Sequence, residues 1–208
     1  MSEDVAIIVP CYGDWGVFDS RTLRAIKSAE QQSVGVREIG AYHRDTLAAA
    51  RNDGANDTDA EWLIFLDADD ELDPHYVEEM MKGTAQLRQP ATLGVYDDGR
   101  EDPFSVNIPP RVSIRQANWF VIGTMIHHDL FNETGGFWDE PAWEDWSLML
   151  RCFALGATWE PMKDAVYKVH VHPAKSGRNN SAEDNRGLFQ QILQANDQWA
   201  QTRGLVIR

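Results

Sequence analysis

The segment that most constrains this chain is an apolar run, Trp62 to Leu66, followed at once by three aspartates within four residues. Short apolar runs without alternation are typical of a strand buried on both faces of a parallel sheet. Asp67, Asp69 and Asp70 therefore stand where the carboxyl end of such a strand is expected, and open α/β sheets bind their ligands at that edge. The sequence thus predicts an α/β fold with a functional site beside this acidic turn.

Strands and helices alternate through the first hundred residues, which predicts right-handed βαβ units and a mainly parallel central sheet flanked by helices. The strands are indicated by apolar, β-branched runs, and the helices by capping residues followed by apolar positions at helical spacing. We expect strands over residues 5–9, 37–42, 62–66 and 91–96, and helices capped by Ser20, starting at Thr46 and capped by Asp73. The first helix is expected to turn Leu23 inward, and the third is expected to extend to Leu87.

The second half of the chain is less regular. Residues 99–110 are polar and interrupted by prolines, which indicates a loop or a small hairpin. The remaining expected elements are a strand at 120–126 with a short helix ending at Gly135-Gly136, a helix at 143–155, a strand at 165–172 and a C-terminal helix at 182–202.

The composition excludes several classes of protein. A length of 208 residues with 43% hydrophobic content suits one domain, and 19 basic against 33 acidic residues give a net charge of −14, which disfavours nonspecific nucleic-acid binding. No stretch has the length and apolarity of a membrane span, and the N-terminus lacks the basic region of a secretory signal. Cys11 and Cys152 are too isolated to indicate a disulfide framework or metal cluster. We therefore expect a soluble, cytoplasmic protein.

The acidic turn has two interpretations. Asp67 and Asp69 can face one divalent cation together, because Mg²⁺ and Mn²⁺ prefer oxygen ligands and keep positions for phosphate oxygens and water. A metal that bridges a diphosphate neutralises the charge of the leaving group. In the alternative the turn is merely solvated and Asp73 caps the next helix. The companion motifs favour metal and donor binding.

Three N-terminal segments resemble family-2 glycosyltransferases in their order and residues. Residues 7–14, IIVPCYGD, resemble the first strand and nucleotide loop of that family. Residues 47–55, LAAARNDGA, resemble its "aARN.G" helix, and residues 65–70, FLDADD, match its acidic segment.

Two later segments extend the resemblance. Residues 135–151 resemble the "GGF…EDxxLxLR" stretch, and residues 167–170, YKVH, resemble the late "YRxH" segment. The similarity covers residues 5–176, and its specificity comes from the ordered set rather than from any single motif. It implies a single-domain GT-A fold, the nucleotide-diphospho-sugar transferase fold. The halves would be 1–98 for nucleotide sugar and metal and 99–180 for acceptor and catalytic base, followed by a C-terminal helix at 181–208.

The resemblance also implies a donor site, in which the nucleotide base and ribose would be lined by Pro10, Tyr12 and Asp14. Arg51 would approach the base or the diphosphate, while Asp67 and Asp69 would hold ribose and metal. Arginine suits an anionic ligand because its planar fork makes paired hydrogen bonds to phosphate. A surface arginine on a short helix is the alternative.

On the acceptor side, the resemblance implies that Asp145 is the general base and that Glu144 shapes the acceptor site, with inversion at the anomeric carbon. A carboxylate at the start of a helix can instead be present only because the helix dipole favours it, but a general base needs such a place beside a cleft. Trp143 and Trp146 flank the pair, and either is a candidate sugar platform. For Trp146 the alternative is helix packing.

His170, or His172 as the second choice, would complete the metal site. The two residues lie two positions apart on an expected strand and so face the same side, which an exposed pair without function also explains. Residues 175–180, which include Arg178, are basic and contain glycine. They are interpreted as a lid over the diphosphate, with an ordinary flexible loop as the alternative.

Two departures from the family pattern affect specificity. The segment usually written "DDGS" here contains His43, Arg44 and Asp45, so one of these would replace the usual base contact or leave it unmade. The chain also stops soon after the last motif, without the additional domain or membrane helices of polymerising relatives, so processive synthesis is not expected.

These observations predict a metal-dependent inverting glycosyltransferase that uses Mn²⁺ or Mg²⁺ and a nucleotide-diphosphate sugar, with UDP-sugar as the first choice. The acceptor hydroxyl is open between a saccharide, a protein, a lipid and a modified nucleobase. The alternatives are a nucleotidyltransferase, against which the loop after the first strand argues because it is neither basic nor glycine-rich, and a catalytically silent nucleotide-sugar-binding module.

Overall fold

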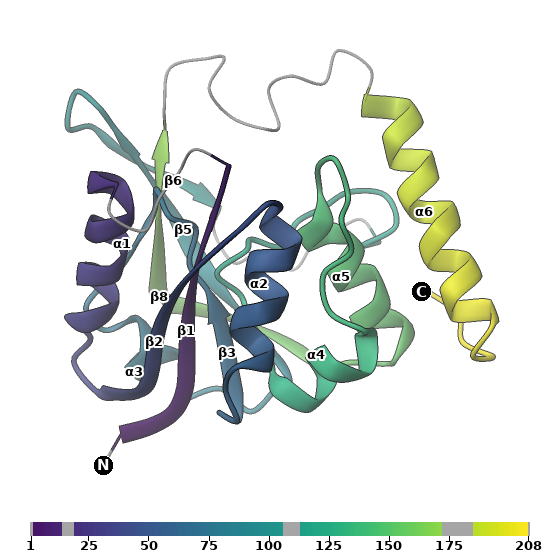
Figure 1. Cartoon of the computed structure of the whole chain (residues 1–208), viewed down its shortest axis with the longest axis horizontal. Helices are drawn as coiled ribbons and strands as arrows, with labels where there is room; N and C mark the ends of the chain where they lie inside the picture. The colour runs from purple at the N-terminus through teal and green to yellow at the C-terminus, as the bar shows by residue number, and fades with distance from the viewer. Residues whose placement is uncertain (1, 14–18, 106–112, 172–184, 208) are drawn as a thin grey trace.

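The computed structural model describes residues 2–13, 19–105, 113–171 and 185–207. Within this part, strands form one sheet and helices pack against it (Figure 1). The strands are β1 (Ser2–Tyr12), β2 (Gly35–Arg44), β3 (Trp62–Phe65), β4 (Glu71–Leu72), β5 (Leu87–Tyr96), β6 (Glu101–Ser105), β7 (Met125–His127) and β8 (Trp159–Val171). The helices are α1 (Ser20–Glu30), α2 (Leu47–Asn56), α3 (Tyr76–Met80), α4 (His128–Thr134), α5 (Glu144–Ala154) and α6 (Asn185–Gln201).

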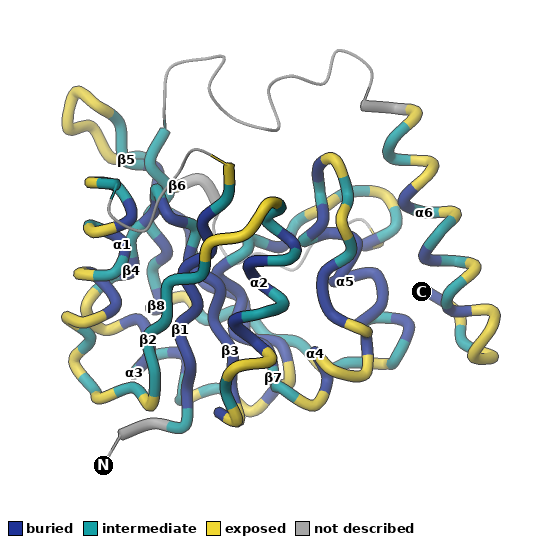
Figure 2. Tube along the Cα trace, in the orientation of Figure 1, coloured by how far each residue is buried: buried dark blue, intermediate teal, exposed yellow. Residues whose placement is uncertain are grey.

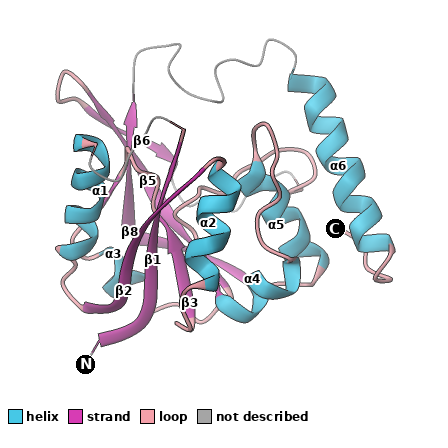
Figure 3. Ribbon diagram, viewed as in Figure 1, coloured by secondary structure: helices cyan, strands magenta, loops and turns pink. Residues whose placement is uncertain are grey.

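The described strands follow the order β2-β1-β3-β7-β5-β8-β4, and β6 pairs with β5 beside this path. The parallel pairings of β1 with β2 and of β5 with β8 are the two longest. A third parallel pairing joins β1 to β3, whereas the antiparallel pairings involve short stretches. The α/β class and the predicted parallel character by length are therefore confirmed, with mixed strand directions in the second half (Figure 3).

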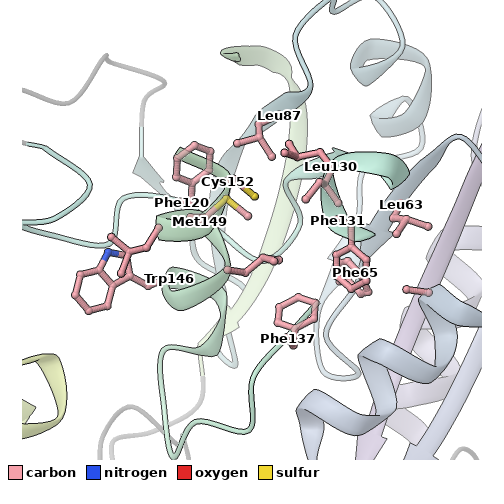
Figure 4. Close-up of a cluster of buried hydrophobic side chains, with 14 of the residues drawn as sticks. Leu63, Phe65, Leu87, Phe120, Leu130, Phe131, Phe137, Trp146, Met149 and Cys152 are labelled. Carbon is pink, nitrogen blue, oxygen red and sulfur yellow. The ribbon is translucent and has the colours of Figure 1, made fainter. Parts of the chain in front are cut away.

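Alternating side chains of the central strands build two cores on opposite faces of the sheet. Ile7 and Val9 of β1 join a cluster with α1 and α3, whereas Ala6 and Ile8 join a cluster with α2, α4 and α5. The central strands are accordingly the most buried part of the chain (Figure 2). In the second cluster Phe65 contacts two other phenylalanines, from α4 and from the loop after it (Figure 4).

Three sequence-based expectations about elements were wrong. Helix α3 ends at Met80, and Leu87 begins strand β5 instead of extending the helix. Leu23 on α1 is 48% exposed, while Ala25 and Ala29 face the core. The N-cap of α1 is Asp19 instead of Ser20, and the Asp19 side chain accepts a hydrogen bond from the Arg21 backbone N–H.

The stretch 120–126 also differs from expectation, because only its end is a strand, β7. Beyond it, α4 ends at Gly135 as predicted, with a φ of 81° that favours glycine. The hairpin alternative for residues 99–110 is confirmed as far as β6, and residues 106–112 lie outside the described part. Among the described helices, none is both long and apolar enough to cross a membrane.

Candidate active site

The acidic turn begins directly after β3 and is held by backbone hydrogen bonds. The Leu66 N–H donates to the Ile8 carbonyl at 2.9 Å, and the Asp70 N–H donates back to the Asp67 carbonyl at 3.0 Å. The Tyr167 hydroxyl on β8 accepts from the Asp67 N–H at 3.1 Å. A strand end and a distant tyrosine therefore fix the turn, so Asp67 and Asp69 project from a defined backbone as the sequence predicted for their location.

Asp70 is the buried aspartate of this turn and is 6% exposed. Burial, with the nearby charges of Asp67 and Asp69, raises the pKa of Asp70 well above its usual range. Its carboxyl accepts from the His170 backbone N–H at 2.9 Å and also hydrogen bonds to Tyr167. Asp70 thus joins β8 to the turn, a contact that the sequence motif alone does not indicate.

Arg51 of α2 is the buried link between the acidic turn and α5. Its guanidinium donates to Asp67 Oδ1 and to Glu144 Oε1, each at 2.6 Å, and the side chain is 2% exposed. Burial alone would lower the pKa of Arg51, but the charges of Asp67 and Glu144 raise it above its usual value. The surface alternative for this arginine is therefore wrong, and its fork is engaged by protein carboxylates.

Asp145, in the first turn of α5, lies beside Glu144 and is among the residues that line a small apolar hollow. Phe65, Phe137 and Leu148 are among the residues that line this hollow. Burial raises the pKa of Asp145 to about 6, the neighbouring Glu144 adds to the rise, and Asn118 donates to its Oδ2 at 3.1 Å. A carboxylate with a pKa near neutrality at the edge of a hollow has the properties of a general base.

Asn52 of α2 holds the loop that precedes α5 through two hydrogen bonds. The Asn52 side-chain amide donates to the Phe137 carbonyl, and Asn52 Oδ1 accepts from the Phe137 N–H, each at 2.8 Å. A Cβ on Gly136 would lie 2.6 Å from Asn52 Oδ1, so the approach requires glycine. Asn52 stands in the "aARN" motif directly after Arg51, so the motif itself was a sequence signal for this residue.

Buried Arg151 fastens the far side of the same loop. It donates to the carbonyls of Thr134 and Gly136 at 3.1 and 2.5 Å, and its guanidinium lies 4.0 Å from the Trp138 ring centroid. It also donates to Asn196 of α6 at 3.0 Å. This arginine, which closes the "EDxxLxLR" pattern, therefore holds the loop and two helices together.

His170 takes a different partner from the one expected. Its Nε2 lies 2.5 Å from Glu71 Oε1, and Arg24 reaches the same Glu71 oxygen at 3.3 Å. Among the described residues no group of three His, Cys, Asp or Glu side chains is arranged to hold a metal ion. Asp67 and Asp69 supply carboxylate oxygens of the kind that Mg²⁺ and Mn²⁺ prefer. With Nε2 on Glu71, His170 could serve such a site through Nδ1, because a metal-bound histidine commonly keeps its other ring nitrogen on a carboxylate.

The expected nucleotide side of the site lies at the ends of β1 and β2. Pro10 pairs with Tyr42 and Tyr12 with Arg44 in the parallel register, which brings the two strand ends together. His43 Nε2 lies 2.9 Å from the Gly13 carbonyl.

Arg44, the second candidate for the base contact, forms an ion pair with Asp53 of α2. Asp45, the third, is exposed at the position before the N-cap of α2. All three residues are exposed, and Asp45 is the carboxylate among them.

The two tryptophans beside Asp145 differ. Trp146 is 1% exposed, stacks on Phe189 with centroids 4.4 Å apart, and donates to the Ile114 carbonyl at 2.7 Å, which fits the helix-packing alternative. Trp143 is partly exposed at the N-cap of α5 with a φ of 60°. Such a backbone conformation is costly for a large side chain, and strain of this kind collects at functional sites.

Three candidate residues, Asp14, His172 and Arg178, lie outside the described residues, as does the whole segment 175–180. The predicted roles of this nucleotide-loop residue, alternative metal ligand and lid therefore stay predictions.

An acidic turn at the carboxyl end of a central strand, tied through one buried arginine to a helix that carries a high-pKa aspartate, defines a group-transfer enzyme of the α/β class. Residues 17–138, which are more than half of the chain, match the family described as Glycosyl transferase family 2. The chain therefore belongs to glycosyl transferase family 2 and has the GT-A fold that its motifs predicted.

Solved structures of similar fold include three of TarS from S. aureus. TarS 1–349 with UDP-GlcNAc gives a TM-score of 0.71 at 14% identity, covering 95% of this chain and 66% of that one. TarS 1–349 with UDP gives 0.64 at 15% identity, covering 95% and 64%. TarS itself gives 0.66 at 14% identity, and this chain spans 39% of its length. No curated protein sequence gave a significant match.

Proposed function

We propose that this glycosyltransferase uses a UDP-sugar with Mn²⁺ or Mg²⁺ and inverts the anomeric centre. The observation that carries the proposal is Arg51, which joins Asp67 of the acidic turn to Glu144 beside Asp145. Donor-side and acceptor-side carboxylates thereby meet across a single guanidinium. The structures of TarS with UDP-GlcNAc and with UDP, which share this fold, support the choice of UDP.

The acidic turn would hold the diphosphate end of the donor. Asp69, with the Asp67 carboxylate oxygen that is not bonded to Arg51, would bind the cation, and His170 would join through Nδ1 while its Nε2 stays on Glu71. A bound divalent cation supplies charge neutralisation of the leaving nucleoside diphosphate. Pro10, Tyr12 and Asp45, at the neighbouring strand ends, would line the nucleoside.

Asp145 would act on the acceptor. Its carboxylate takes the proton of an acceptor hydroxyl while that oxygen attacks the anomeric carbon and the bond from this carbon to the diphosphate breaks. A direct displacement from the face opposite the leaving group gives inversion. Trp143, which is partly exposed beside Asp145, is the proposed sugar platform.

The test is a thermal-shift screen of nucleotide sugars with Mn²⁺ and with chelator, followed by UDP release from the best ligand. A ligand that prefers the native state raises the melting temperature by mass action. We expect a UDP-sugar to stabilise the protein only with metal, and Asp145→Asn to abolish UDP release while the stabilisation persists. Metal-independent stabilisation, or pyrophosphate release from a nucleoside triphosphate, would contradict the proposal.

A further inference from the structure

Residues 113–120 form a loop beside Asp145 that is fastened to three different elements. Three interactions fix it: Trp146 Nε1 of α5 donates to the Ile114 carbonyl at 2.7 Å, Arg115 forms an ion pair with Asp197 of α6, and Gln89 Nε2 of β5 donates to the Trp119 carbonyl at 2.6 Å. Side chains on this loop therefore have fixed places relative to α5.

Asn118 on this loop has its amide orientation fixed from both ends. Its Oδ1 accepts from the Phe120 backbone N–H at 3.2 Å, which leaves the NH₂ group to face α5. Nδ2 then donates to Asp145 Oδ2 at 3.1 Å. The two contacts agree on one assignment of oxygen and nitrogen, because a flipped amide would point an NH₂ at a backbone N–H and an oxygen at a carboxylate.

The Asp145 carboxylate is thereby held at both of its oxygens. Oδ1 accepts from the Trp146 backbone N–H at 2.7 Å, and Oδ2 accepts from Asn118. Each carboxylate oxygen has two lone-pair positions, so one on each oxygen is still available for a reacting hydroxyl. Without Asn118, the hydrogen bond from the Trp146 N–H would be the remaining one to this carboxylate from the residues that the structure describes.

We propose that Asn118 is a positioning residue that orients the Asp145 carboxylate for proton transfer from the acceptor. The inference rests on the proposed function, in which Asp145 is the general base. It assigns to a loop asparagine outside the family motifs the task of aiming the base.

The charges around Asp145 predict how the loss of Asn118 appears in experiment. Burial is the largest influence that raises the pKa of Asp145, Glu144 of α5 adds to it, and Arg51 of α2 opposes it. The hydrogen bond from Asn118 also lowers this pKa, because an amide N–H stabilises the ionised form. Removing the donor therefore moves the pKa of Asp145 further upward.

The experiment compares Asn118→Ala and Asn118→Asp with a matched control, Asn132→Ala. Asn132 is an exposed asparagine of α4. Asn118→Asp can still accept from the Phe120 N–H but cannot donate to Asp145, so it separates the loop contact from the contact to the base. The Asp145 carboxyl carbon is titrated by NMR, with its signal assigned through Asp145→Asn.

We expect the apparent pKa to rise by about 0.5 to 1 unit in Asn118→Ala and by more in Asn118→Asp, with no change in Asn132→Ala. The kcat for UDP release from UDP-GlcNAc with Mn²⁺ should fall about tenfold, with little change in KM. The acid limb of the pH profile of kcat should shift in the same direction as the pKa of Asp145 measured by NMR. An unmoved titration in both Asn118 variants would overturn the inference.

The two proposals fail in different ways. Full UDP release in Asp145→Asn would remove the proposed general base. Loss of turnover in Asp145→Asn, combined with an unchanged limb in both Asn118 variants, would leave the base in place and refute only the role of Asn118.

Discussion

Arg51 donates a hydrogen bond of 2.6 Å to Asp67, which places a fully buried positive charge directly behind the acidic turn. The same guanidinium reaches Glu144 at the start of α5. One guanidinium therefore connects the turn after strand β3, helix α2 and helix α5. A change in charge at the turn alters the electrostatic environment of Asp145 through Arg51 and Glu144. Asp67 and Glu144, which are 77 residues apart in sequence, are brought together at this point.

Replacing Arg51 by glutamine should destabilise the protein. The change leaves Asp67 and Glu144 without their common cation, which for a buried pair costs about 3 kcal/mol, or roughly 6 to 12 °C in melting temperature for a chain of this size. Arg37→Gln is the matched control, because Arg37 makes its ion pairs with Asp4 and Asp59 at the surface and should cost less than about 1 kcal/mol. Equal melting temperatures for the two variants would show that the contact carries no stability.

Gly123→Ala should weaken donor binding from a position outside the site. An added Cβ would lie 2.2 Å from Tyr167 Cδ2, so the ring that holds the Asp67 N–H must move. We expect a loss of about 1 to 3 kcal/mol in stability and a weaker UDP affinity, measured by thermal unfolding and calorimetry. Gly187→Ala on α6, where nothing lies within 4 Å, should leave UDP binding unchanged. Unaltered affinity in Gly123→Ala would argue against the coupling.

Asn52→Ala should release the loop before α5. It removes both 2.8 Å hydrogen bonds to Phe137 and leaves a half-buried N–H and C=O without these partners, at a cost of about 2 to 3 kcal/mol. We expect a lower melting temperature together with a fall in kcat, because the loop leads into Glu144 and Asp145. The exposed Asn132→Ala should behave as the wild type. A drop in stability with full activity would mean that the clamp is structural alone.

Activity should rise with pH through an acid limb near 6, since Asp145 must be ionised to accept a proton and burial raises its pKa to about 6. The sign for stability is opposite. The folded pKa lies above the ordinary value of 3.8, so the ionised form is disfavoured on folding and stability falls as pH rises from about 4 to 6. Asp145→Asn should remove this component of the pH dependence. Kinetic and thermal profiles from pH 4 to 8 measure both, and a limb near 4 would contradict the assignment.

Local patterns predicted most of the fold because they report local physics. The apolar run at β3, the alanine-rich run of α2 and the glycine end of α4 each follow from a few neighbouring residues. The sequence predicts a longer helix than α3, because Leu87 fits helical spacing from Met80. Its place in β5 depends instead on pairing with Trp159, 72 residues away, which no local pattern contains.

The site divides in the same way. The ordered motifs indicated the acidic turn, Arg51 and the start of α5, and the structure connects all three. The contact of His170 with Glu71 and that of Asn118 with Asp145 join residues 99 and 27 positions apart. A lone asparagine in an irregular loop gives no sequence signal, so only the folded arrangement identifies it.

The central claim is that the acidic turn binds a nucleoside diphosphate through a divalent cation, and calorimetric titration of UDP tests it most directly. With Mn²⁺ we predict binding to the wild type and to Asp145→Asn, and a loss of at least about tenfold in affinity, or 1.4 kcal/mol, in Asp69→Asn. Without metal, Asp69→Asn should bind no worse than the wild type, because a carboxylate repels phosphate. UDP affinity that is equal with and without Mn²⁺, and equal in wild type and Asp69→Asn, would contradict the account.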